Sequence, residues 1–421
     1  REAEDKISKK AVIEKLEPME LVQKYTNLFH WAMRQFNNLE PSIEPTATGH
    51  IVEQIDMIKE IIRAGYAYEV NGNVYFDVKK YAAGYEYGKL SGRVIDELLT
   101  TTRELEGQGD KRDKADFALW KAAPPEHIMR WNSPWGEGFP GWHIECSAMS
   151  SKYLGKQFDI HGGGMDLQFP HHESEIAQST ICNHEAPVRY WLHNNMITIN
   201  GKKMGKSYNN VIKLTELFSG EHPILEKAYS PMTVRFFILQ THYRSTLNFS
   251  NEGLLAAEKG LKRLMEAFEW LQQLEVDTLP TDNSKVDDEL NEKVLRLLAE
   301  LPEYMNDDFN TAKVLGSMFE LVPVINSIKD KAIDAAALPV ATLHALKREL
   351  KHFVVDIFGL QTEEAKEGDK LKGIMDVLIN LRKEARAKKD WATSDAIRNQ
   401  LAGIGIMLKD EKEGGMSWSL M

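Results

Sequence analysis

The first residues of the chain show a helical hydrophobic pattern. Apolar residues recur at spacings of three and four within residues 11–40, at Leu21, Tyr25, Leu28, Phe29, Ala32 and Phe36. This is the spacing of one face of a helix. A second helix is predicted from Ile51 to Ala64, because Gly65 is the kind of residue that ends helices.

The pattern changes to alternation after Gly65. Asn71 and Gly72 lie between two alternating, aromatic-rich runs, which is a strong signal for a tight β-hairpin. Residues 85–115 are polar and rich in turn formers. From Phe117 short β-like runs alternate with helical stretches, as in QFDIHGGG, a helix over 171–182 and WLHNNMITING. This order predicts an α/β domain with a parallel sheet, whose catalytic loops lie at the carboxyl ends of strands.

The chain is predicted to be helical after about residue 250. One apolar helix face is marked by Leu254, Ala257, Leu261, Leu264, Phe268 and Leu271. Further helices are predicted over 290–301, 309–328 and 339–358, followed by a polar linker at 361–370. The remaining residues are expected to form a small separate unit, with a basic helix and then a β-hairpin that ends at Trp418.

Length, charge and cysteine content exclude several classes of protein. A chain of 421 residues is too long for one compact domain. It has neither a long apolar run nor a visible signal peptide. The net charge of −11 argues against a general nucleic-acid coat protein, although a local basic patch is enough to bind RNA. The two cysteines, Cys146 and Cys182, cannot form a disulfide framework, so a cytoplasmic protein is expected.

The run HGGGMDLQFPHHESE carries candidate metal ligands. His171 and Glu175 are four residues apart on a predicted helix, so their side chains share one face. Cys146 lies upstream, at the end of a predicted strand, GWHIEC. A Cys, a His and a Glu are good zinc ligands and fill three of four tetrahedral positions. The spacing is equally compatible with His172 as the ligand, or with a plain helix start whose acidic residues the helix dipole favours.

Two other segments are candidates for binding phosphates. Glycines 162–164 follow the strand QFDI, where glycine lets a ligand approach the backbone, although a tight turn also explains them. The run KKMGKS places Lys203 and Lys206 three apart, where they can neutralise the charge that builds up on a polyphosphate. It is not a Walker A loop, and a solvated basic turn is the alternative interpretation.

Together these segments resemble cysteinyl-tRNA synthetases, a family of class I aminoacyl-tRNA synthetases. The resemblance rests on PGWHIECSAM, FDIHGGGMDLQFPHHESEIAQS and KKMGKS, and it extends through SPWGEGFPGWH, YWLH, HYRSTLNFS, DDFNTAKVL and KDWATSDAIRNQLAGIGIMLKD. It implies an α/β, Rossmann-like catalytic domain with an insertion, a connecting region, a helical bundle and an anticodon-binding unit. The expected ranges are 1–210 with the insertion at about 45–115, then 211–250, 251–360 and 361–421.

The resemblance also implies the reaction and the residues that serve it. Such an enzyme activates cysteine with ATP to cysteinyl-AMP and transfers the cysteinyl group to tRNA(Cys). The family binds one zinc ion through two Cys, one His and one Glu, and the matching ligands are Cys146, His171 and Glu175. The lysines of the family's KMSKS loop correspond to Lys203 and Lys206, with a glycine in place of the first serine.

Further expectations follow from the same resemblance. Gly163, Gly164 and Asp166 fall at the ATP site, with Asp166 contacting a ribose hydroxyl or the substrate amine and Mg²⁺ assisting. Trp142 and His143 are expected to line the cysteine pocket, although Trp142 is equally compatible with core packing. A basic helix over 382–389, with Trp391 nearby, is expected to contact tRNA. We expect a monomer that does not associate with membranes.

The amino end departs from the family pattern. Family members open with a first strand, another zinc cysteine and the HIGH motif, whereas REAEDKISKK resembles the stretch just after the second strand. The sequence is interpreted either as an incomplete fragment with impaired adenylation or as part of a longer, competent enzyme. Two other functions compete: a ligase that joins cysteine to an amino-sugar, and a non-catalytic RNA-binding fragment. Glu175 and the basic unit at the carboxyl end favour the tRNA enzyme over the amino-sugar ligase.

Overall fold

Two compact units, Arg1–Leu360 and Gln361–Met421, make up the chain. The computed structural model describes residues 6–93, 108–125, 127–279, 283–362, 367–410 and 416–420. Within these ranges no helix is both long enough and apolar enough to cross a membrane.

The chain begins with two helices, α1 (Lys6–Glu14) and α2 (Pro18–Gln35), where the pattern predicted one stretch over 11–40. Pro18 explains the break, because proline has no N–H to continue a helix but suits the first position of a new one. The predicted apolar face is only partly covered. Its exposed members are Tyr25, Leu28 and Phe29.

A four-stranded antiparallel sheet follows, in the order β1-β2-β3-β4. Its strands are β1 (Ala67–Val70), β2 (Asn73–Phe76), β3 (Phe117–Ala122) and β4 (Gly138–Pro140). The predicted hairpin is confirmed, since β1 and β2 pair around Asn71 and Gly72. Their φ angles of 54° and 78° are the positive values that a type I′ turn requires. Two helices precede or follow this hairpin: α3 (Ile51–Arg63), which confirms the second predicted helix, and α4 (Val78–Ala82).

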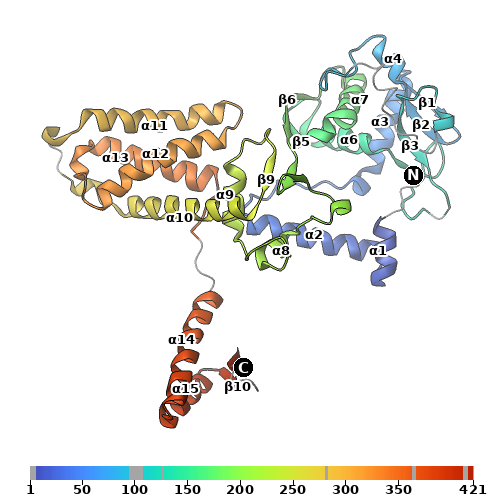
Figure 1. The fold of residues 1–421 in the computed structure, drawn as a ribbon. Coiled ribbons are helices and arrows are strands. Elements are labelled where there is room, and N and C mark those ends of the chain that lie inside the picture. The colour runs from blue at the N-terminus through green and yellow to red at the C-terminus, as the bar shows by residue number, and fades with distance from the viewer. Residues whose placement is uncertain are drawn as a thin grey trace. The chain divides into compact units, whose positions relative to one another are not determined.

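The predicted parallel pairing is found between β5 (Phe158–Gly164) and β6 (Val188–Asn194). Two helices lie beside this pair (Figure 1), and they are α6 (Trp142–Leu154) and α7 (Glu173–Asn183). The prediction that GWHIEC is a strand was wrong, because this segment forms the first turns of α6. Ile144 and Ala148 are both buried one helical turn apart, so packing imposes the helical period.

A small mixed sheet with strand order β8-β7-β9 lies in the chain between the parallel pair β5–β6 and the helices that follow residue 250. Its strands are β7 (Ile197–Ile199), β8 (Lys202–Lys203) and β9 (Leu247–Phe249). The helices between β8 and β9 are α8 (Leu214–Ser219) and α9 (Pro231–Leu239). Strand β7 is antiparallel to β8 and parallel to β9, so the KKMGKS segment and the loop before β9 lie at opposite edges of this sheet.

The rest of the first unit is helical, as predicted. It consists of α10 (Asn251–Gln273), α11 (Asp288–Asn306), α12 (Thr311–Lys329) and α13 (Val340–Lys351), with a π-helical extension over His352–Ile357. Every residue of the apolar face predicted for α10 is buried. These helices lie side by side (Figure 1). They share one hydrophobic core with α9 and β9.

The second unit contains α14 (Glu367–Ala387), α15 (Trp391–Gly403), β10 (Ile406–Asp410) and β11 (Met416–Leu420). The predicted terminal hairpin is confirmed by the pairing of Leu408 with Trp418. Residues 363–366 of the predicted polar linker lie outside the described residues, and α14 begins directly after them. The predicted basic helix over 382–389 ends at Ala387, and Arg382 is only 3% exposed, whereas Lys383, Lys388 and Lys389 are exposed.

Candidate metal centre and active site

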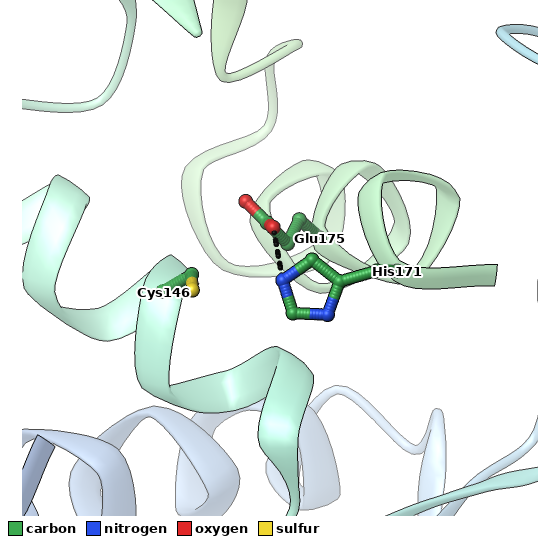
Figure 2. Close-up of side chains that lie close together, drawn as sticks. All are labelled: Cys146, His171 and Glu175. Carbon is green, nitrogen blue, oxygen red and sulfur yellow. Dashed lines mark ion pairs between the residues drawn. The ribbon is translucent and has the colours of Figure 1, made fainter. Parts of the chain in front are cut away.

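The three predicted metal ligands come together from α6, from α7 and from the short turn that leads into α7. Cys146 lies on α6, His171 lies in the short π-helical turn Gln168–His172, and Glu175 lies in the first turn of α7. Their ligand atoms all lie within 4.8 Å of one another (Figure 2). His171 and Glu175 are buried and Cys146 is half-buried. A sulfur, a nitrogen and an oxygen donor therefore lie close together in a largely buried part of the protein.

The chemistry of these donors fits a zinc ion. Glu175 Oε1 lies 2.9 Å from His171 Nε2, yet this oxygen is buried and accepts no hydrogen bond. An unsatisfied buried carboxylate oxygen is costly unless a cation compensates it. Burial raises the pKa of the Cys146 thiol to about 12, and the carboxylates of Glu175 and Glu145 add to the effect. A bound cation would reverse this preference, because zinc takes cysteine as the thiolate.

His143 and Trp142 hold the imidazole of His171 in place. His143 Nδ1 lies 2.8 Å from His171 Nδ1, so the remaining nitrogen of His171, Nε2, is the one that faces Glu175. Burial lowers the pKa of His143 to about 3, so its ring is neutral and can accept a hydrogen bond. The ring of Trp142 lies 4.2 Å from that of His171, centroid to centroid, while its side chain is 59% exposed. Both predicted pocket residues therefore contact the same metal-ligand candidate, and Trp142 is not a core residue.

A second histidine group adjoins the first and was not predicted. His161, His172 and Glu175 also bring ligand atoms within 4.8 Å of one another, so His172 joins His161 and not Cys146. His172 Nδ1 lies 2.8 Å from His193 Nε2, and burial lowers the pKa of His172 to about 3. The alternating pattern of FDIHGGG and YWLHN is the only feature of the sequence that could have indicated this histidine group. The pattern brings the histidines together only when the parallel register, with His161 opposite Trp191, is also known.

The last two glycines of β5 make room for side chains of this same chain. A Cβ at Gly163 would lie 2.8 Å from His172 Cε1, and one at Gly164 would lie 2.5 Å from Asp166 Oδ1. Real Cβ atoms do not approach so closely, so larger residues would displace these neighbours. Asp166 itself is exposed. The structure therefore gives these two glycines a packing role beside the predicted one at the ATP site.

Glu173 was also missed by the sequence analysis. Its side chain is 1% exposed and accepts hydrogen bonds from Gly88 N–H, Leu90 N–H and both the N–H and the hydroxyl of Ser91. The distances are 3.2, 2.6, 2.7 and 3.1 Å. Gln168 adds a bond to Leu90 O at 2.8 Å. The loop 88–91 is thereby attached to the start of the helix that carries Glu175.

Asn210, which the sequence analysis did not identify, holds the KKMGKS segment through two hydrogen bonds. Lys203 is exposed on β8, and Lys206 begins a 3-10 turn, Lys206–Tyr208. The buried Asn210 accepts from Gly205 N–H at 2.9 Å and donates to Lys203 O at 3.1 Å, so it joins both ends of the turn. In the described part of the chain no hydrogen bond or ion pair links this segment to Cys146, His171 or Glu175. The KKMGKS segment and the metal-ligand group are therefore separate parts of the predicted site.

Three family models match the chain in sequence order. The model for the class I (C) tRNA synthetase catalytic domain matches residues 1–259. A DALR domain matches 302–362, and the cysteinyl-tRNA ligase anticodon binding domain matches 369–416. The first of these contains both metal-ligand groups and the KKMGKS segment.

Curated relatives cover the whole chain. The cysteine–tRNA ligases of Bacteroides thetaiotaomicron and Porphyromonas gingivalis are 54% and 53% identical over 422 residues, which is 100% of this chain and 83% of each relative. The crystal structure of Mycobacterium tuberculosis methionyl-tRNA synthetase with bound methionyl-adenylate shares the fold, with a TM-score of 0.58, 12% identity and coverage of 84% of this chain and 82% of that one. The chain belongs to the cysteinyl-tRNA synthetase family of class I aminoacyl-tRNA synthetases.

Proposed function

We propose that the protein activates cysteine with ATP and transfers it to tRNA(Cys), with a zinc ion selecting the thiol of the substrate. The observation that carries the proposal is that the ligand atoms of Cys146, His171 and Glu175 lie within 4.8 Å of one another. The names of the curated relatives support the reaction, since each is a cysteine–tRNA ligase.

The three ligand residues suit an enzyme that must distinguish cysteine from serine. Serine differs from cysteine only in having oxygen for sulfur, and pocket shape alone rejects such a near-isostere by only about 100-fold. Zinc held by Cys146, His171 and Glu175 would supply a further preference, because thiolate is a strong zinc ligand and an alcohol is a poor one.

The other residues of the site position the reactants. His143 fixes the ring of His171, and Trp142 lies beside that ring with most of its side chain exposed. We expect this exposed part of Trp142 to contact the incoming amino acid. Lys203 and Lys206 would neutralise the phosphates of ATP, with Mg²⁺, where charge develops during adenylation. Asp166, exposed after β5, would accept from a ribose hydroxyl or the substrate amine.

The carboxyl-terminal unit would bind the RNA. Its family match is an anticodon binding domain, and the exposed Lys383, Lys388 and Lys389 with the exposed Trp391 offer cations and an aromatic face. Cations neutralise phosphates, and unpaired bases stack on aromatic rings.

The proposal is tested by two assays on the same preparation, which are cysteine-dependent ATP–pyrophosphate exchange and charging of tRNA(Cys). We expect both activities, and we expect both to disappear when zinc is removed by a chelator and to return on adding Zn²⁺. Exchange without charging, with an amino-sugar accepted in place of tRNA, would favour the small-molecule ligase. Binding of tRNA with no exchange at all would favour the non-catalytic RNA-binding protein.

Lys206→Ala is expected to slow adenylation by about 100-fold and to leave cysteine binding unchanged. Loss of one positioned group that stabilises developing charge costs about 10²–10³ in rate. The measurement is the kcat of ATP–pyrophosphate exchange beside the KM for cysteine. Lys202→Ala is the matched control, because Lys202 is the neighbouring exposed lysine of β8 and has no predicted role. An unchanged kcat in Lys206→Ala would refute the assignment.

A further inference from the structure

Two of the candidate metal ligands, Cys146 and Glu175, lie on different helices, α6 and α7 (Figure 2). Aliphatic side chains of both helices belong to one buried cluster, to which α6 contributes Ile144 and α7 contributes Ile181. Burial of apolar surface is not directional, so these contacts hold the helices together without fixing how far one has moved along the other. The spacing of the two ligands therefore depends on a further, directional contact.

A buried hydrogen bond joins the two helices next to these ligands. Ser147 Oγ donates to Gln178 Oε1 at 2.6 Å, and the two residues are 1% and 0% exposed. Ser147 directly follows Cys146 on α6, and Gln178 follows Glu175 by about one helical turn on α7. A hydrogen bond has a preferred length and angle, so this one restrains α6 against α7 at the level of the ligands.

A second hydrogen bond joins the same helices further from the ligands. Asn183 Nδ2 donates to Ser151 Oγ at 3.3 Å. The two bonded pairs occur in the same order along α6 and α7, so the helices run parallel and this second bond lies about one turn beyond the first. The two bonds are of the same kind and join the same helices, but only the first adjoins the metal ligands.

Gln178 is an unfavourable residue for stability alone. Its Nε2 is buried and has no hydrogen-bond partner within the described ranges of the chain. A buried N–H group without an acceptor costs free energy, whereas an unbranched apolar side chain of the same length would fill this place without that cost. The position that the amide imposes on Ser147 accounts for its presence better than the stability that it adds.

We propose that Ser147 and Gln178 are positioning residues for the zinc site, because their hydrogen bond sets the distance between the thiolate of Cys146 and the carboxylate of Glu175. The inference rests on the proposed zinc-dependent function. Zinc holds its ligand atoms at about 2.0–2.3 Å, so a small shift of one helix along the other changes the fit of the ion. Residues that only support metal ligands alter metal affinity by about 10- to 100-fold.

The test is the double variant Ser147→Ala/Gln178→Met, which replaces both bonded groups by apolar ones of similar size and leaves neither a hydroxyl nor an amide unpaired. Removing both partners of a buried hydrogen bond is nearly neutral for stability, so we expect a folded protein whose Tm changes by less than about 3 °C. We expect its affinity for zinc, measured by competition with a chromophoric chelator, to fall by about tenfold or more.

The matched control is Ser151→Ala/Asn183→Leu, which removes the second hydrogen bond between the same helices. We expect this variant to keep the zinc affinity of the native protein, because the bond that it loses does not adjoin a ligand. A role in helix packing alone predicts the opposite result, in which the zinc affinity of both double variants follows their Tm.

Cobalt in place of zinc reports the geometry of the site. Co²⁺ bound to the native protein should show the absorption bands of a thiolate-bound ion, and these bands should shift and weaken in Ser147→Ala/Gln178→Met but not in the control. Equal zinc affinities of the two double variants, a loss of affinity that only follows Tm, or unchanged cobalt bands would each overturn the inference. A native protein that binds no zinc would instead overturn the proposed function, and this inference with it.

Discussion

Cys146→Ser is expected to lose zinc and the discrimination against serine in the same step. An alcohol is a poor zinc ligand, and removing even a residue that only supports a ligand costs 10- to 100-fold in metal affinity. We therefore expect the zinc affinity to fall by more than about 100-fold. Zinc content by elemental analysis, together with ATP–pyrophosphate exchange driven by cysteine and by serine, measures both effects.

Cys182→Ser is the matched control for this variant. Cys182 is the other cysteine, is also half-buried, and also has a pKa that burial raises to about 12. Its sulfur lies 3.7 Å from Met57 O, away from the metal-ligand group. We expect Cys182→Ser to keep its zinc and its exchange activity. Full zinc content in Cys146→Ser would show that the thiol is not a ligand.

Glu173→Ala is expected to give the largest loss of stability. The substitution would leave the buried N–H of Gly88, the part-buried N–H groups of Leu90 and Ser91 and the hydroxyl of Ser91 without their acceptor. Removing one partner of a buried charged hydrogen-bond network costs about 3–5 kcal/mol. In a domain of this size that corresponds to a fall of about 5–15 °C in the apparent Tm.

Amide hydrogen exchange would show where the Glu173→Ala variant loses stability. The amides of residues 88–91 should exchange much faster in Glu173→Ala than in the native protein, because they lose the carboxylate that protects them. Glu185→Ala, which changes an exposed glutamate in the loop after the same helix, should leave both Tm and exchange unchanged. A shift of less than 1 °C in the Glu173 variant would refute the structural role.

Local patterns predicted much of the fold but not its packing. The Asn-Gly hairpin and the apolar face of α10 follow from short-range chemistry, and both are confirmed. The segment GWHIEC was wrongly predicted as a strand because Trp142, Ile144 and Cys146 alternate over six residues. The helical period becomes visible only through the burial of Ala148 beyond that run, and this burial depends on tertiary contacts.

The candidate site was predictable where its residues are close in sequence. His171 and Glu175 lie four residues apart where the π-helical turn runs into α7, so their spacing was informative. The approach of His161 to His172, and of His172 to His193, depends on the register of two parallel strands and on the turn between them. Glu173 is adjacent to the predicted ligands, but its partners are more than 80 residues away, and no local pattern identifies such partners.

The amide of Asn210 leaves Lys203 and Lys206, two of the three lysines of KKMGKS, with unequal freedom. Lys203 is held twice, by its pairing with Thr198 in the sheet and by its carbonyl bond to Asn210. Lys206 follows Gly205 within the closed turn and has no strand partner among the described residues. Lys203 would therefore act as a fixed anchor for a phosphate, while Lys206 would approach as the turn moves. The turn that carries Lys206 could move only if the hydrogen bonds of Asn210 break, so the free energy of these bonds would determine how easily it moves.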